Sequence, residues 1–265
     1  MNNKLLYEAT RDQLSRAIIP ANTRTYKAIS HESLMDLTME SIYQAGFNVK
    51  SEHYSSAKDG MVATGRYLID DVGDSEMKLA VNWQNSYDKS LPVVFSMGAL
   101  VLVCTNGMMA TRDVYSFRKK HVGEIQSYTP LKIPEYIKGG GDMFAGLQNE
   151  REALKQIEIS KRTTSEIIGR MFLEEDFIES TQLNIIKREL KNPTHDYKSP
   201  GSLWELFQHT TFAIGGIHPS HWMQDHLDAH RFFTGIAEAM TEDASYELLV
   251  SDPYSVTEEV ENAFI

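Results

Sequence analysis

Cations and aromatic rings recur in the first half of the chain, at positions where strands are expected to run or to end. Proteins bind single-stranded nucleic acid with cations along a groove and with rings on which bases stack. The candidate contacts of this kind are Arg66, Lys78, Trp83, Tyr87, Lys89, Arg112, Arg118, Lys119 and Lys120. A solvated sheet surface also carries Lys and Arg, so an ordinary surface is the alternative interpretation of the same residues.

The C-terminal stretch combines acidic side chains with an apolar tip. Residues 258–265 read EEVENAFI, so Glu258 and Glu259 precede the final pair, Phe264 and Ile265. Carboxylates imitate phosphates towards a basic groove, and a terminal phenylalanine can anchor in a pocket of a partner protein. The stretch resembles the C-terminal tips of bacterial and phage single-strand DNA-binding proteins, which implies a partner-binding tail. A tail that only aids solubility would have the same composition.

Four histidines fall within thirteen residues: His218, His221, His226 and His230. His226 and His230 are spaced i,i+4, so on a helix they share one face and can hold a single metal ion. The sequence between them, HLDAH, lacks the glutamate at its second position that a zinc protease uses. Leu227 lies beside this pair, which favours packing, so structural histidines are the simpler interpretation and His226 and His230 are weak metal candidates.

Other signatures of catalysis are absent from the sequence or weak. The single cysteine, Cys104, follows the apolar run 101–103, so we expect it to be buried and unreactive. No P-loop and no dinucleotide fingerprint is present, so no cofactor is predicted. One cysteine excludes an internal disulfide and fits a reducing cytoplasm. No apolar run reaches about 18 residues, so no membrane-spanning helix is expected.

The net charge of −11 is distributed unevenly along the chain. Residues 1–130 contain 14 Lys and Arg against 14 Asp and Glu, whereas residues 131–240 contain 12 against 16. Residues 241–265 contain no Lys or Arg and 7 acidic residues. The total charge argues against a nucleic-acid-binding protein, but the neutral N-terminal half can still present a local basic face.

The period of the apolar residues predicts the elements that would position these side chains. Helical spacing predicts helices over residues 7–19 and 31–45, with Ser30 as the cap of the second. From Phe47 the period becomes two, which predicts an antiparallel meander. Its expected strands are 47–53, 61–69, 77–83 and the apolar run 93–104, with 114–117 as a candidate for one more.

After the glycines at 139–141 the pattern becomes helical. Helices are expected over 142–172 and 177–190, after the cap Ser202, and from Ser220 to about Met240. The fold class is therefore α+β: an antiparallel sheet flanked by helices, followed by a mainly helical C-terminal half. We expect a sheet domain over 1–138, a helical region over 142–240 and an acidic, flexible tail over 241–265.

Two short motifs and a tryptophan carry a resemblance to a known family. NSYDKS at 85–90, VCTNG at 103–107 and Trp204 within a helix resemble the YafZ/YfjQ-like domain family of unknown function, carried by phages, plasmids and genomic islands. Members usually have glycine where this chain has Lys89. The resemblance implies a phage or mobile-element origin and no catalytic residues. The order of helix, antiparallel strands and helix is also similar to phage single-strand annealing proteins of the Erf and RecT type.

These observations predict a non-catalytic DNA-metabolism protein that binds single-stranded DNA in annealing or recombination, as a cytoplasmic homo-oligomer. One alternative is a phage-encoded effector that binds and inhibits a host defence protein, because strong negative charge can mimic DNA. The other is a metal-dependent enzyme that uses the cluster from His218 to His230. A continuous positive groove lined by Trp83, Tyr87 and Arg118 would favour the first function.

Overall fold

Strands built on the two-residue period form one antiparallel sheet, which confirms the predicted fold class. The computed structural model describes residues 7–57, 59–102, 107–109, 115–215 and 219–242. The strands in these residues run in the order β1-β2-β3-β4-β5-β6, and β7 pairs with the other half of β5. They are β1 (Tyr7–Ala9), β2 (Val49–Ala57), β3 (Val62–Gly73), β4 (Met77–Ser86), β5 (Val93–Val101), β6 (Gly107–Met109) and β7 (Ser116–Lys119).

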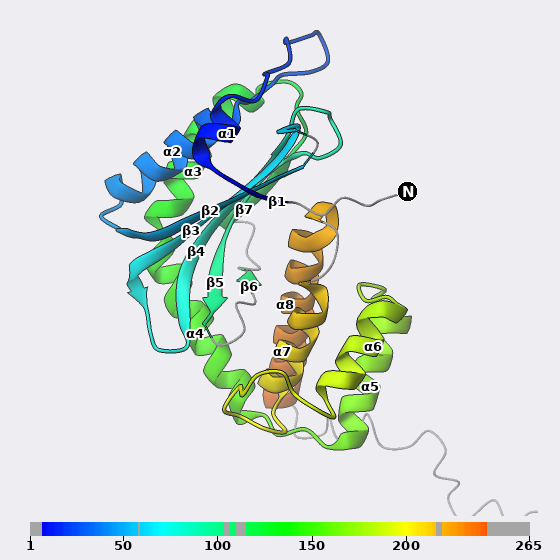
Figure 1. Ribbon diagram of the computed structural model, residues 1–265. Helices are drawn as coiled ribbons and strands as arrows, with labels where there is room; N and C mark the ends of the chain where they lie inside the picture. The colour runs from blue at the N-terminus through cyan, green and yellow to red at the C-terminus, as the bar shows by residue number, and fades with distance from the viewer. Residues whose placement is uncertain (1–6, 58, 103–106, 110–114, 216–218, 243–265) are drawn as a thin grey trace, which may run out of the picture.

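Helices cover the sheet and form the C-terminal half. They are α1 (Arg11–Ser15), α2 (His31–Gln44), α3 (Ile125–Lys138), α4 (Gly140–Gln156), α5 (Lys161–Leu173), α6 (Ser180–Glu189), α7 (Leu203–Ile214) and α8 (Pro219–Glu242). Figure 1 shows α2 and α3 on one side of the sheet, α7 and α8 beyond its other side, and α5 and α6 outermost. Among the described residues, no helix is both long and apolar enough to cross a membrane.

The main core lies between the sheet and the helices α2 to α4. Alternate residues of the strands point into it, including Tyr67, Trp83 and Phe95, all with exposed fractions of 0%. The predicted caps Ser30 and Ser202 both accept a hydrogen bond from the third residue of their helices. Local capping and period therefore position most of the elements where the sequence predicts them.

The N-terminal helix expected over residues 7–19 is only partly present. Residues 7–9 form β1 instead and pair with β2, so that Tyr7 lies opposite Ser56. The helix begins after Thr10, whose side chain and that of Gln13 form a reciprocal capping box. A three-residue strand is too short to show a period, so pairing with the edge of β2 decides its conformation.

The helical pattern beyond the sheet is also divided differently. Helix α3 contains Pro130 and Pro134, residues that normally end helices, and it was not predicted. Its apolar side, including Ile133 and Ile137, packs in the core and offsets the lost backbone hydrogen bonds. The single helix expected over 142–172 is two, because Ile157 is extended and Ser160 caps α5.

Helix α4 connects the sheet to the C-terminal helices. At its start, Gly140 lies so close to the sheet that a Cβ atom there would be 2.6 Å from Met97 Cε. Further along, Arg151 Nη1 lies 2.9 Å from Asp74 Oδ2 in the β3–β4 turn, and Lys155 Nζ lies 2.6 Å from Glu76 Oε2. Close packing and two ion pairs therefore fix α4 on the sheet.

Candidate nucleic-acid interface

Three segments that are far apart in the sequence meet at one end of the sheet. The loop before α2 joins the chain after β7: the Lys27 amide donates to the His121 carbonyl at 2.8 Å, and His121 Nδ1 donates to the Lys27 carbonyl at 3.2 Å. The end of β4 joins them, because Tyr26 Oη donates to the Ser86 carbonyl at 3.3 Å. We call this region the basic end, after its cations Arg24, Lys27, Lys89, Arg118, Lys119 and Lys120.

Two of these cations lie over aromatic rings. Lys89 Nζ is 5.0 Å from the centroid of the Tyr26 ring, and Lys119 Nζ is 3.5 Å from that of Tyr128. The Tyr26 ring in turn packs beside His121, with 5.2 Å between centroids. Burial lowers the pKa of His121, so this imidazole is neutral at pH 7. A cation–π contact orients an ammonium without neutralising its charge, so both lysines remain available to an anion.

Positive charge dominates the basic end. None of its six cations forms an ion pair with another described residue. The acidic residues of the same three segments, 20–28, 86–92 and 116–124, are Asp88 and Glu124. Asp88 Oδ1 accepts a hydrogen bond from the Ser90 amide at 2.9 Å, which shapes the β4–β5 turn. The three segments therefore carry more cations than carboxylates, which gives this end of the sheet a local positive charge.

The turn holds Lys89 in an unusual backbone conformation. Its φ is 65°, in the left-handed region that favours glycine and costs other residues about 1–2 kcal/mol. The turn therefore holds this lysine in a strained conformation, with its ammonium over the Tyr26 ring.

Two of the predicted cationic contacts lie outside the basic end. Arg66, in β3, faces away from α2 and α3, and its Nε donates to Asn82 Oδ1 at 3.2 Å. Three strand spacings separate β3 from β7, so Arg66 lies on the order of 15 Å from Arg118. Lys78 lies near the start of β4, at the opposite end of the sheet, and donates to the Asp70 carbonyl at 2.8 Å. The predicted contacts that lie in the three joined segments are Lys89, Arg118, Lys119 and Lys120. On β7 neighbouring side chains alternate, so Lys119 lies on the α3 side, over Tyr128, and Arg118 on the opposite face of the sheet.

The two aromatic rings predicted as stacking platforms are buried in the core. Trp83 is 0% exposed, and its Nε1 donates to Tyr67 Oη at 3.4 Å. Tyr87 is 4% exposed, and its ring stacks on that of His31 with 3.9 Å between centroids. Bases cannot stack on rings that other side chains cover, so in this structure the two rings support the fold. Trp83 continues the apolar alternation of β4, which is the sequence signal for burial.

Arg24 and Lys27 are not among the predicted contacts, although both are at the basic end. They belong to a loop without a periodic pattern, and only the pairing of Lys27 with His121 brings that loop to β7. No local signal predicts a contact between residues 94 positions apart. Arg112 and the tail residues Glu258, Glu259, Phe264 and Ile265 lie outside the described residues.

The histidine pair on α8 packs against other helices. His230 is 0% exposed, its Nε2 lies 2.9 Å from Glu150 Oε2 on α4, and its ring lies 6.0 Å from that of Phe207. His226 is also buried, at 1% exposed. Within the described part of the chain, no three His, Cys, Asp or Glu side chains are grouped closely enough to hold a metal ion. His218 lies outside that part, and the side chain of His221 is not described.

Comparison with known proteins gives a family and no activity. The family model described as Domain of unknown function (DUF932) matches residues 21–230. The chain belongs to the DUF932 family. The match begins in the loop that carries Arg24 and Lys27 and ends within α8, so the DUF932 domain includes the sheet, the basic end and the C-terminal helices. Searches of curated proteins and of solved structures each found no match.

Proposed function

We propose that this DUF932 protein binds single-stranded DNA through its phosphates, at the basic end of the sheet and without catalysis. The supporting observation is the meeting of three separate segments that together carry six cations, with no ion pair to any described residue. Phosphate contacts give affinity without sequence readout, and they are the main contribution to non-specific binding. The protein would act in annealing or recombination on a phage or other mobile element, in the cytoplasm and as a homo-oligomer.

Because Trp83 and Tyr87 are buried, the proposed binding depends on charge and not on base stacking. Proteins that stack bases on exposed rings bind single strands tightly and discriminate them from duplex DNA. Of the rings at the basic end, those of Tyr26 and His121 are 3% and 5% exposed, and Lys119 lies over the half-buried ring of Tyr128. The affinity of the basic end therefore depends on charge, falls steeply with salt and changes little with base sequence.

Fluorescence anisotropy with a labelled single-stranded oligonucleotide at low salt tests the proposal. The double variant Lys27→Glu/Lys120→Glu reverses two cations of the basic end, and we expect it to weaken binding at least tenfold. The matched control is Lys187→Glu/Lys191→Glu, which makes the same change of net charge at exposed positions at the end of α6 and just after it. We expect the control to bind within about twofold of the unaltered protein, because its charges lie beyond screening range.

Two results would reject the proposal. One is the absence of binding at low salt, both by the full chain and by a chain that ends at Glu242 and so lacks the acidic stretch. The other is an equal loss of affinity in the two double variants, because that would show a response to net charge alone. Protein that fails to bind DNA but captures one stoichiometric host protein would instead favour an effector.

A further inference from the structure

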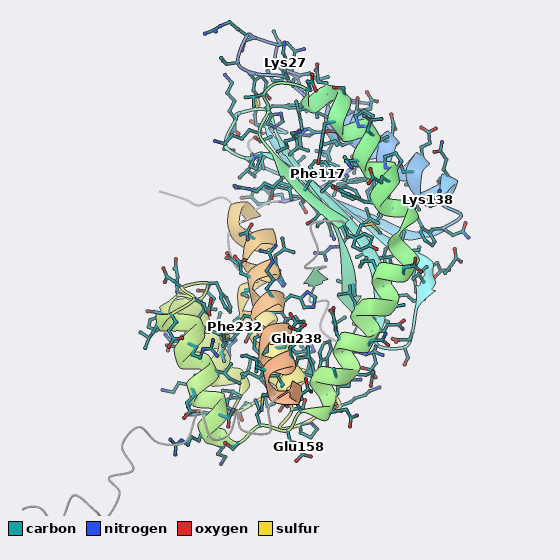
Figure 2. The ribbon with its side chains drawn as sticks, turned by 180° about the vertical axis from the view of Figure 1, so that it is seen from behind. Lys27, Phe117, Lys138, Glu158, Phe232 and Glu238 are labelled. Carbon is teal, nitrogen blue, oxygen red and sulfur yellow. The ribbon has the colours of Figure 1, made fainter. Side chains whose placement is uncertain are left out.

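A groove on the C-terminal half is lined by four apolar and four charged side chains and lies next to the end of α8. It has a volume of about 710 Å³ and lies between α8 and the chain at the end of α5 and beyond it. Phe177, Phe232, Ile236 and Ala239 are apolar residues of its lining. Figure 2 shows Phe232 on the side of α8 that faces α5 and α6.

The charged rim of the groove is already neutralised. Arg170 Nε lies 3.2 Å from Glu174 Oε2, and its guanidinium lies 5.3 Å from the centroid of the Phe232 ring. Arg231 Nη1 lies 3.8 Å from Asp228 Oδ1. A strongly acidic ligand would have to displace these carboxylates. The groove therefore suits an occupant that is mainly apolar and carries little charge.

The chain itself supplies such an occupant close by. Ala239 lines the groove, α8 ends three residues later at Glu242, and 23 further residues follow. Residues 246–250 read YELLV, an apolar run with one charge, and Pro253 closes the run. The tip at 258–265 carries three carboxylates and fits the neutralised rim less well.

The lengths of the groove and of this run agree. The lining residues of α8 extend from Asp228 to Ala239, which is about 16 Å along a helix. Five residues in extended conformation span about 16–17 Å. Residues 243–245 are enough for the chain to reverse direction after α8, so residues 246–250 can run back along the groove antiparallel to the helix.

We infer that residues 246–250 dock in this groove of the same molecule, with Leu248 and Leu249 against the half-buried rings of Phe177 and Phe232. This contact is independent of DNA binding at the basic end, which lies at the far end of the sheet from the α5–α6 pair in Figure 1.

Disulfide trapping in the full chain tests the contact. In a Cys104→Ser background, the pair Gly235→Cys and Leu249→Cys should form an intramolecular disulfide in oxidised glutathione. A Cβ atom at Gly235 has nothing within 4 Å, so the cysteine fits. The matched control places the helical cysteine at Gly146 on α4, where a Cβ atom also has nothing within 4 Å. We expect the first pair to cross-link at least tenfold faster than the control pair.

Three outcomes would overturn the inference. They are equal rates for the two pairs, a disulfide that forms only between molecules, and a disulfide that forms faster in the pair Gly235→Cys and Phe264→Cys than in the pair Gly235→Cys and Leu249→Cys.

Hydrogen exchange gives a second readout that needs no cysteines. We expect Leu248→Asp/Leu249→Asp to raise exchange at residues 246–250 at least tenfold. Val256→Asp/Val260→Asp, with the same added charge, should leave it within twofold. Equal exchange in both variants would contradict docking of residues 246–250.

Discussion

Lys89 is the residue at which stability and the proposed function oppose one another. Its φ of 65° favours glycine, while its ammonium lies at the basic end over Tyr26. We predict that Lys89→Gly raises the free energy of unfolding by up to about 1 kcal/mol, because glycine adopts this conformation without strain. The same variant should bind oligonucleotide several-fold more weakly. Urea denaturation and anisotropy measure the two effects, and a loss of stability without a loss of affinity would contradict this role.

His31 makes the stability of the protein depend on pH. Burial lowers its pKa to about 4, although its Nε2 donates to the Gly60 carbonyl at 2.8 Å. Its Nδ1 accepts from Asn85 Nδ2 at 3.1 Å, so a proton added there would meet another donor. Between pH 6.5 and about 4 the unfolded chain therefore binds a proton that the folded chain does not. Stability falls as the pH falls through this range, by up to about 3 kcal/mol from His31 alone.

The variant His31→Gln should make the free energy of unfolding less dependent on pH between 6.5 and 4. It should not remove the dependence, because burial also lowers the pKa values of His121 and His209. Urea denaturation at several pH values measures the slope. His53→Gln, at an exposed position on β2, is the matched control. Equal slopes in His31→Gln and in the unaltered protein would show that His31 does not cause the dependence.

At the scale of elements, the ion pairs of α4 hold the sheet against the helices. Arg151 is buried and donates to both Asp74 and Glu152. Partial burial raises the pKa of Asp74, but hydrogen bonds from the Met77 and Glu76 amides and from Gln148 and Arg151 lower it to about 2. The stability that Asp74 contributes is therefore present above its ordinary pKa near 4 and is lost as the pH falls towards 2.

We predict that Arg151→Met lowers the free energy of unfolding by about 2 kcal/mol, because it leaves a half-buried carboxylate without its cation. Arg16→Met, at the end of α1, is the control. It removes an exposed i,i+4 pair with Asp12, and we expect it to cost less than about 0.5 kcal/mol. Urea denaturation measures both. If Arg151→Met loses no more free energy of unfolding than the control, the ion pair between Arg151 and Asp74 does not hold α4 on the sheet.

Local sequence patterns predict some of the helices and strands and miss others. The two-residue period from Phe47 onward predicts β2 to β5, and the serines at 30 and 202 predict the starts of α2 and α7. The prolines of α3 and the short β1 follow no local rule. Packing of an apolar face and pairing with an edge strand outweigh the intrinsic preferences there.

At the scale of the whole molecule, charge alone should set the affinity for DNA. Neutralising a phosphate of a single strand contributes about −0.7 to the slope of log K against log salt concentration. If five cations of the basic end engage, we predict a slope between about −3 and −4, and a loss of roughly 100-fold in affinity between 50 and 200 mM salt. Anisotropy titrations at several salt concentrations measure the slope. A slope near zero would indicate contacts to bases or to a different surface.

The sequence by itself determined the fold class, the caps of α2 and α7, the two faces of β2 to β5 and the division of charge along the chain. These depend on neighbouring residues, whose spacing is visible in one dimension. Only the tertiary structure decided which cations meet and which rings are covered. Lys27 reaches His121 through a loop closure that no local pattern encodes, and β4 is buried on both faces, so even its polar face, with Asn82 and Gln84, is covered. Alternation separates the faces of a strand, but what packs on each face is decided by segments far away in the chain.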